Sequence, residues 1–321
     1  MFIKISVVIF LALVAALTIL FRPLPDIIPM PVDSQAPDAG SPEIDPRGAS
    51  VELNHGLATD DVFVLLHGVT NSPLQFLDFG KLLYERGANV LIPRLPFHGY
   101  RDRMTDAHQF LTAQIMLDEA NRAIDRAKKI GRRVTVVGLS VNGNTAAWVA
   151  QNRSDVDFAV VMAPFFAAKG MPDWSISPAA RLFSHLPNVF VWWDPKMKDK
   201  LDEGALTYPR FSTRSLASIL GLGVDVFREA KSNPPAARRI LMMTSAADTA
   251  ISNPRADQLA GIWKKSAPDR VSTYQFPLEW NVPHDWMDAQ QPGQKVDIVY
   301  PILLDLLLGP TTAEATPVNS P

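Results

Sequence analysis

The stretch VTVVGLSVNG at residues 134–143 decides how this chain folds. Its first five residues carry no charge and are mostly β-branched, as a strand buried on both faces requires. A helical pattern follows over residues 141–152. Ser140 therefore lies in a tight turn between a strand and a helix. Such a turn places the serine hydroxyl at the carboxyl end of its strand, where open α/β sheets bind their ligands.

The geometry expected around Ser140 is that of a nucleophile elbow. Small residues beside the serine allow a strained turn, and the following helix N-terminus adds partial positive charge where an oxyanion would develop. The usual pattern is G-x-S-x-G, but here Asn142 holds the fifth position and Gly143 comes one residue late. A side chain at position 142 must find room between the helix and the strand. With this departure, the pattern predicts Ser140 as a nucleophile.

Outward from the elbow, short apolar runs alternate with helical patterns. Helices are expected at about 72–87, 109–129, 141–152, 253–266 and 295–307. The strand candidates are VFVLL (62–66), NVLI (89–92), VTVVG (134–138), FAVVM (158–162), ILMMT (240–244) and VSTYQF (271–276), with VELN (51–54) as an outer antiparallel strand. Continuous apolar runs indicate strands covered on both faces. The sequence thus predicts an α/β fold, with a mostly parallel central sheet and helices on both faces.

One long stretch, between Met162 and Ile240, shows no convincing buried strand. A structureless loop of that length is uncommon in a compact domain, so we expect a helical cap insertion at about residues 165–236. The insertion carries aromatic side chains that could line an apolar substrate pocket or, with equal weight, form the core of the cap itself. The pocket candidates are Phe165, Phe166, Trp174, Trp192 and Trp193.

A serine nucleophile needs a base, and the base needs an orienting acid. Of the six histidines, His284 lies in a loop between the last strand candidate and the last helix, at the end of the sheet where Ser140 is expected. Asp248 directly follows the strand candidate at 240–244 and is the predicted acid. The alternatives for the acid are Asp225, Glu279 and Asp285. Asp285 adjoins His284 in the chain and cannot easily turn back to its ring.

An oxyanion hole needs two donors. The backbone N–H of Val141, directly after the nucleophile, is one candidate. The other is the backbone N–H of Val69, in the loop LLHGVTNSP after the first central strand, where Gly68 allows a sharp turn. We expect His67 to support this loop rather than to transfer protons.

The composition excludes several kinds of site. The 321 residues include no cysteine, which excludes a disulfide framework, a thiolate metal site and a cysteine nucleophile. Lys and Arg number 31 and Asp and Glu 33, for a formal net charge of -2. This near-neutral balance argues against a basic surface for nucleic acid. Nothing in the sequence determines the oligomeric state.

The two ends of the chain differ from its middle. Residues 1–22 contain an uncharged run at 5–21, ISVVIFLALVAALTILF. As a helix this run spans roughly 25 Å, near the lower limit for the bilayer core of about 30 Å. It is either an uncleaved membrane anchor, with the catalytic domain outside the cytoplasm, or a cleaved signal of a secreted or periplasmic protein. Proline-rich residues 23–50 predict an extended linker, 51–308 the folded domain and 309–321 a disordered tail.

Taken together, these pieces resemble the α/β-hydrolase superfamily, and within it the carboxylesterase and monoacylglycerol-lipase-like group. LLHGVTNSP (65–73) resembles the first-strand loop of that group and RLPFHG (94–99) the second-strand loop. GLSVNG (138–143) occupies the elbow, AADTAIS (246–252) the acid loop and VPHDW (282–286) the histidine loop. The order Ser140, Asp248, His284 is the chain order of the superfamily.

The resemblance implies an activity as well as a fold. It implies an enzyme with the α/β-hydrolase fold that cleaves carboxylic esters through an acyl-enzyme on Ser140, with no metal and no organic cofactor. The substrate would be a small-molecule or lipid ester, such as a monoacylglycerol or lysophospholipid. An acyltransferase, a thioesterase or an amidase or peptidase would use the same triad, and a non-catalytic binding protein on this fold is a further alternative.

Overall fold

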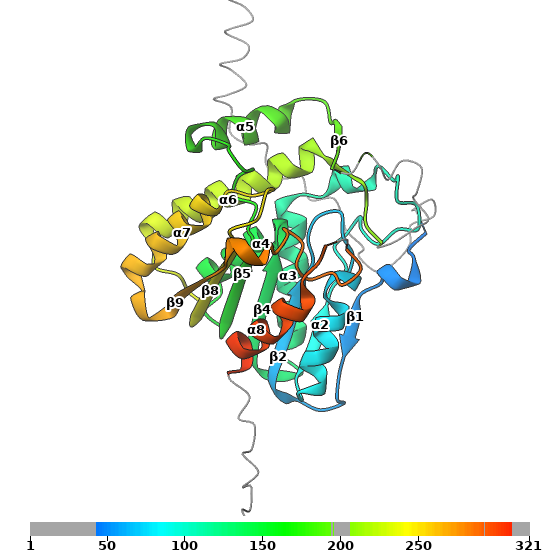
Figure 1. Ribbon diagram of the computed structural model, residues 1–321, viewed down its shortest axis with the longest axis vertical. Coiled ribbons are helices and arrows are strands. Elements are labelled where there is room, and N and C mark those ends of the chain that lie inside the picture. Colours follow the sequence, from blue (N-terminus) through cyan, green and yellow to red (C-terminus); the bar gives the residue numbers. More distant parts are fainter. Residues whose placement is uncertain (1–42, 194, 196–205, 292, 310–321) are drawn as a thin grey trace, which may run out of the picture.

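The computed structural model describes residues 43–193, 195, 206–291 and 293–309, and its centre is a seven-stranded sheet (Figure 1). The strands are β1 (Val51–Leu53), β2 (Thr59–Leu66), β3 (Asn89–Ile92), β4 (Gly131–Leu139), β5 (Phe158–Met162), β8 (Arg239–Ser245) and β9 (Val271–Phe276). They lie in the order β1-β3-β2-β4-β5-β8-β9. The edge strand β1 pairs antiparallel with β3, and the other neighbours pair in parallel.

Helices cover both faces of this sheet (Figure 1). On one face, α2 (Leu74–Glu85) and α8 (Val296–Leu308) bury side chains such as Phe76, Phe79 and Leu303 against the strands. On the other face lie α3 (Ala113–Ala127), α4 (Val141–Asn152) and α7 (Asn253–Ser266). Because each central strand is covered on both sides, its residues are apolar without alternation.

The strands and helices predicted from the sequence are present, and the predicted α/β fold with a mostly parallel central sheet is confirmed. The antiparallel edge strand β1 is also confirmed. The second predicted helix begins later than expected, at Ala113, because the Thr112 hydroxyl accepts a hydrogen bond from the Ile115 N–H at 3.3 Å and caps it. Before it, residues Ala107–Phe110 form a 3-10 turn.

The chain between β5 and β8 forms the cap (Figure 1). It contains α5 (Asp173–His185) and α6 (Thr213–Ser232), as a helical insertion requires. It also contains a two-stranded antiparallel sheet of β6 (Phe190–Trp192) and β7 (Arg210–Ser212), which the sequence did not predict. Three-residue strands are too short to produce a periodic pattern. Ile219 of α6 shares an apolar cluster with Val141, so the cap lies over the carboxyl end of β4.

The start of the described chain packs onto the domain earlier than the predicted linker boundary at residue 50. The Asp45 N–H donates to the Gly99 carbonyl at 2.9 Å, and the Arg101 N–H donates to the Glu43 carbonyl at 2.8 Å. Both hydrogen bonds join backbone groups, so the types of the side chains in this segment do not predict them. The predicted apolar segment at 5–21 lies outside the described residues, as does residue 310 onward. No helix within the described ranges is long and apolar enough to cross a membrane.

Candidate active site

The turn between β4 and α4 is strained at Ser140, whose φ is 60° and ψ is -117°. A non-glycine residue with positive φ carries a conformational cost that surrounding structure must support. The support comes from β5 and the chain after it. The Ser140 N–H donates to the Met162 carbonyl at 2.9 Å, and the Ser140 carbonyl accepts from the Phe165 N–H at 3.1 Å. The sequence-predicted elbow is therefore present in the structure.

The glycines around Ser140 are required by close backbone approaches. A Cβ atom at Gly138 would overlap the Asn142 carbonyl oxygen. A Cβ atom at Gly143 would lie 2.8 Å from both the Met162 carbonyl oxygen and the Pro164 Cα. Gly143 thus provides the close contact between helix and strand, one residue later than the usual pattern. The Asn142 side chain turns instead toward β2, and its Nδ2 donates to the His67 carbonyl at 2.6 Å.

Ser140, His284 and Asp248 form one hydrogen-bonded chain. His284 Nε2 lies 3.0 Å from Ser140 Oγ, and His284 Nδ1 lies 2.7 Å from Asp248 Oδ2. The three residues follow β4, β9 and β8, whose parallel directions bring their carboxyl ends to one edge of the sheet. The contacts join residues 144 and 36 positions apart in the chain.

Asp248 is suited to orient the histidine ring. Its Oδ1 accepts hydrogen bonds from the Ala250 N–H at 2.7 Å and the Ile251 N–H at 3.3 Å. Burial by itself raises the pKa of this carboxyl, but hydrogen bonds from His284 and the two backbone N–H groups outweigh it and hold the pKa of Asp248 below its ordinary value. The ionised carboxylate accepts from His284 Nδ1–H, which leaves Nε2 to accept the Ser140 hydroxyl proton.

The alternative acids lie elsewhere. Asp225, on α6, forms an ion pair with Arg228 at 2.6 Å. Glu279 lies in the 3-10 turn Leu278–Trp280 that precedes the histidine loop. Asp285 turns away from the His284 ring, and its Oδ2 accepts from Gln75 Nε2 at 2.7 Å.

Three other histidines are buried with neighbouring rings: the His98 ring centroid lies 5.7 Å from that of His67 and 6.4 Å from that of His108. His67 Nδ1 lies 2.9 Å from the Gly68 carbonyl, and its Nε2 accepts from the Leu95 N–H at 3.1 Å. Burial lowers the pKa of His67 and His98 to about 3 and that of His108 to about 4. Across the described part of the chain, no group of three or more His, Asp or Glu side chains is arranged to hold a metal ion.

The two predicted oxyanion donors flank the serine. Val141 is the first residue of α4, so its N–H has no partner within the helix. A Cβ atom on Gly68 would lie 3.6 Å from Ser140 Cβ, which places the Gly68–Val69 peptide beside the nucleophile. Val69 and Val141 also belong to one apolar cluster. The loop and the elbow are therefore neighbours, as the donor pair requires.

The predicted pocket aromatics have different environments. Phe165 is half-buried and packs in the same cluster as Val141. Phe166 lies in the core against Phe227, with ring centroids 5.4 Å apart. Trp174 is 79% exposed on the cap surface, and Trp193 is 43% exposed with its Nε1 donating to the Tyr208 carbonyl at 2.6 Å. Trp192 is half-buried in β6.

The structure adds apolar neighbours of the elbow that the sequence reasoning missed. They are half-buried and share the cluster of Val69 and Val141: Phe97, Ile115 and Leu216. They come from the loop after β3, from α3 and from α6, so no local pattern links them. For Phe97, the only sequence feature that could have pointed to the site is its place in the second-strand loop RLPFHG. In the structure it adopts a φ of 66° there.

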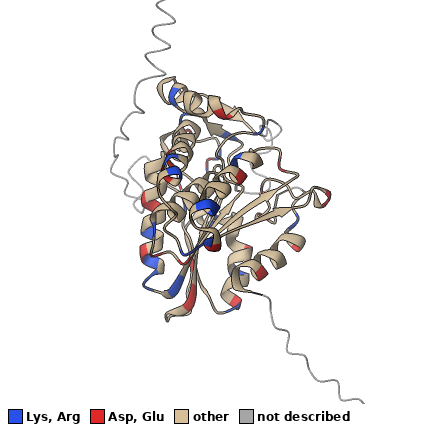
Figure 2. Cartoon of the chain, turned by 90° about the vertical axis from the view of Figure 1, so that its left-hand side faces the viewer, with Lys and Arg blue, Asp and Glu red and all other residues tan. Residues whose placement is uncertain are grey.

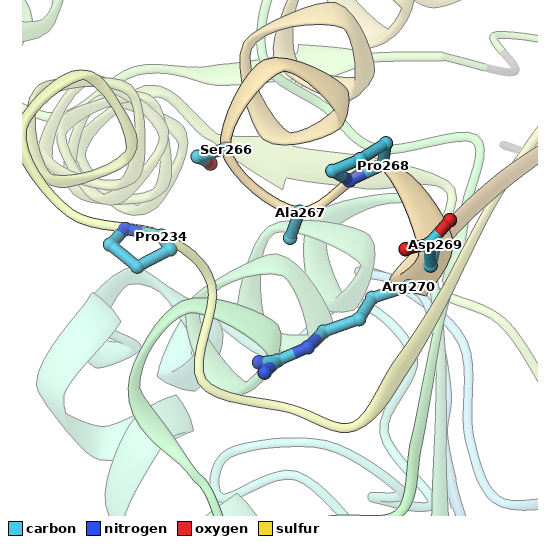
Figure 3. Close-up of a pocket in the computed structure, with 6 residues that line it drawn as sticks. All are labelled: Pro234, Ser266, Ala267, Pro268, Asp269 and Arg270. Carbon is cyan, nitrogen blue, oxygen red and sulfur yellow. The ribbon is translucent and has the colours of Figure 1, made fainter.

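A surface pocket lies elsewhere on the domain (Figure 3). Its lining residues are Pro234, Ser266, Ala267, Pro268, Asp269 and Arg270. These precede β8 and β9, so the pocket lies at the amino ends of the strands, opposite to Ser140. Figure 2 shows that the positions of basic and acidic residues are interspersed along the described ribbon.

Comparisons with known proteins agree with this architecture. The model of the alpha/beta hydrolase family matches residues 63–312. The sequence matches no curated protein. A monoacylglycerol lipase of Paleococcus ferrophilus is similar in structure, with 15% identity and a TM-score of 0.60 over 81% of this chain and 97% of that one. A soluble variant of Saccharomyces cerevisiae monoglyceride lipase is also similar in structure, with 13% identity and a TM-score of 0.60 over 87% of this chain and 97% of that one.

A third similar structure is one of two metagenome-derived lipolytic enzymes, with 15% identity and a TM-score of 0.60 over 82% of this chain and 98% of that one. At these identities the likeness concerns the fold. The family model covers most of the chain, including the second half of β2, the elbow, the acid loop and the histidine loop. The chain belongs to the alpha/beta hydrolase family.

Proposed function

We propose that this protein is a serine hydrolase that cleaves carboxylic esters, with Ser140 as nucleophile, His284 as general base and acid, and Asp248 as the orienting carboxylate. The observation that carries the proposal is the hydrogen-bonded chain from Ser140 Oγ through His284 to Asp248. Its two distances are within the reach required for proton transfer. The strained elbow presents the serine at the carboxyl edge of the sheet, where open α/β sheets bind their ligands.

The reaction proceeds in two halves. His284 Nε2 takes the Ser140 proton while Oγ attacks the ester carbonyl carbon, and the Val69 and Val141 N–H groups bind the oxyanion. The tetrahedral intermediate collapses, and His284 gives the proton to the leaving alcohol. A water molecule, deprotonated by His284, then attacks the acyl-enzyme, and the acid leaves with Ser140 restored. Asp248 stabilises the imidazolium that forms twice in this cycle.

The substrate is proposed to be a small-molecule or lipid ester with an apolar acyl or alcohol group. Phe97, Phe165 and Leu216 are half-buried apolar side chains in the cluster that contains both oxyanion donors. An apolar substrate group would gain contact area with them next to the reacting carbon. Monoacylglycerol is the lipid that the names of two similar structures suggest.

The N-terminal proposal is separate from the chemistry. We propose that residues 5–21 carry the domain out of the cytoplasm, either as an anchor that stays or as a signal that is removed. Mass spectrometry of the mature N-terminus distinguishes the two, because a chain that starts near Leu17 has lost the anchor.

The catalytic proposal is tested by labelling and turnover together. The protein is treated with a fluorophosphonate probe and assayed on p-nitrophenyl esters of increasing acyl length. Ser140→Ala is expected to lose both labelling and turnover, whereas the control Ser272→Ala, at an exposed position on β9, keeps both. Labelling that persists in Ser140→Ala refutes the assignment of the nucleophile. Turnover of thioesters or amides in place of esters, or transfer to an added alcohol in place of water, would identify a thioesterase, an amidase or an acyltransferase.

A further inference from the structure

The peptide bond between His67 and Gly68 borders the candidate oxyanion hole. It directly precedes the peptide that carries the Val69 N–H. A Cβ atom on Gly68 would be 3.6 Å from both Ser140 Cβ and Gln75 Oε1. The peptide therefore lies between the nucleophile and the first turn of α2. Glycine at position 68 gives this backbone freedom to rotate, so its orientation must be determined by its hydrogen bonds.

Side chains from two different helices bind the two ends of that peptide. At one end, the Gly68 N–H donates to Gln75 Oε1 at 2.7 Å. At the other end, the His67 carbonyl accepts from Asn142 Nδ2 at 2.6 Å. Gln75 and Asn142 are both buried, with exposed fractions of 3% and 1%. Rotation of the peptide would break both bonds and leave buried polar groups without partners, which is costly.

The orientation of the Gln75 amide is in turn set by Asp285. Gln75 Nε2 donates to Asp285 Oδ2 at 2.7 Å, and Asn71 Nδ2 donates to the same oxygen at 3.0 Å. Asp285 Oδ1 faces two more donors, the N–H groups of Met287 and Asp288, at 3.2 and 3.3 Å. The Asp285 carboxyl group is bonded by four N–H donors, so both of its oxygens act as acceptors. It therefore holds the Nε2 end of the amide and directs Oε1 to Gly68.

We propose that Asn142, Gln75 and Asp285 are positioning residues that clamp the His67–Gly68 peptide and thereby aim the Val69 N–H at the oxyanion. This inference rests on the proposed function. The clamp gives a role to Asn142, which replaces the usual glycine of the elbow and connects the elbow to the oxyanion loop. It also gives a role to Asp285, which joins the histidine loop to the same peptide through Gln75. None of the three side chains is hydrogen-bonded to Ser140 Oγ or to the His284 ring.

The first test is Gln75→Ala, with Gln151→Ala as a matched control. Gln151 is also a buried glutamine bonded at both ends of its amide, by Trp263 Nε1 at 2.8 Å and the Asn233 carbonyl at 3.2 Å, but it lies at the far end of α4 from Ser140. Gln75→Ala is expected to lower kcat on a p-nitrophenyl ester about 10- to 100-fold, less than the loss of a whole donor. KM stays within about 2-fold, because the clamp aims a donor at the transition state.

Labelling provides a second readout that a general loss of stability would not change. Phosphonylation of Ser140 also develops an oxyanion, so the labelling rate of Gln75→Ala should fall by the same factor as kcat/KM. Gln151→Ala should lose a comparable amount of thermal stability and keep the parent kcat and labelling rate. Equal kinetics in Gln75→Ala and Gln151→Ala overturn the proposal.

Asp285→Asn and Asn142→Gly keep the test decisive if Gln75→Ala does not fold. Asp285→Asn removes the acceptor-only carboxylate and should match the kcat loss of Gln75→Ala. Where Gln75→Ala does fold, the double variant Gln75→Ala/Asp285→Asn should be no slower than either single variant, because all three break the same chain of bonds. Asn142→Gly restores the usual elbow glycine and should nevertheless lower kcat about 10-fold.

The outcomes separate the clamp from the function itself. Multiplicative losses in the double variant, or changes confined to KM, would refute the clamp. An active Ser140→Ala variant would refute the proposed function. An inactive Ser140→Ala together with a fully active Gln75→Ala, Asp285→Asn and Asn142→Gly would refute the clamp alone.

Discussion

A change from pH 7 to pH 5 is expected to destabilise the fold through three buried histidines, His67, His98 and His108. Burial lowers the pKa of His67 and His98 from 6.5 to about 3 and that of His108 to about 4. The rings therefore stay neutral in the folded protein and become protonated in the unfolded chain. Since the unfolded state binds more protons below pH 6.5, the free energy of unfolding falls as the pH falls.

The magnitude follows from the difference in proton binding. Between pH 7 and pH 5, each histidine with an unfolded pKa of 6.5 and a folded pKa of 4 or below removes about 1.8 kcal/mol of stability. The result depends little on whether the folded pKa is 3 or 4, because the folded ring is neutral at pH 5 in both cases. The three rings together remove about 5.5 kcal/mol, a large part of the 5–15 kcal/mol typical of a folded domain.

Other titrating groups also change the total loss of stability between pH 7 and pH 5. The test therefore compares this loss between the parent and single variants. Burial raises the pKa of Asp285 and Asp288, and such carboxyls act in the opposite direction, since the folded state takes up their protons first. His98→Asn removes one histidine and places an amide N–H where Nδ1 lies, 3.0 Å from the Pro96 carbonyl. The control His55→Asn removes an exposed histidine at the surface.

The assay is urea unfolding followed by circular dichroism at pH 7, 6 and 5. Whatever its stability at pH 7, His98→Asn should lose about 1.8 kcal/mol less than the parent between pH 7 and pH 5. His55→Asn, at an exposed position, is the reference for replacing a histidine outside the buried group. If the parent and His98→Asn lose the same stability over this range, the reasoning from burial is wrong.

Three further variants test the site and its packing. Asp248→Asn should fold and lower kcat by about 10⁴-fold, as loss of the orienting carboxylate does in other triads; normal turnover would refute its role. Gly143→Ala should cost about 1–3 kcal/mol in urea unfolding, because the new Cβ would lie 2.8 Å from backbone atoms of Met162 and Pro164. Gly261→Ala, in α7 with no atom within 4 Å of the new Cβ, should instead add about 0.5–1 kcal/mol, and a loss there would contradict the helix argument.

Much of the fold was predictable because its signals are local. The runs at 134–138, 158–162 and 240–244 are continuously apolar, and the structure buries each of them as a central strand. Helices α4 and α7 begin where the sequence placed them, after the elbow serine and at Asn253. The pair of three-residue strands β6 and β7 escaped prediction, because they are held by the cap around them and have no pattern of their own.

The three residues of the candidate triad could be predicted from the sequence, but the residues that pack around them could not. Ser140, Asp248 and His284 each follow a strand, and parallel strands bring such positions to one edge. The sequence showed that Asn142 replaces the usual glycine of the elbow, but it did not show which group the Asn142 side chain would bind. Its contact with the His67 carbonyl joins residues 75 positions apart, and no local pattern reports a contact of that range.

By itself, the sequence determined the α/β class, the positions of the strands, the elbow at Ser140 and the absence of cysteine chemistry, because these depend on residue type and short-range periodicity. The tertiary structure alone decided that Asp285 binds Gln75, and that Gln75 and Asn142 hold opposite ends of one peptide. The physical reason is that a hydrogen bond needs atoms within about 3 Å of each other. Such proximity between distant residues arises only when the crossovers of the sheet bring β2, β4, β8 and β9 together.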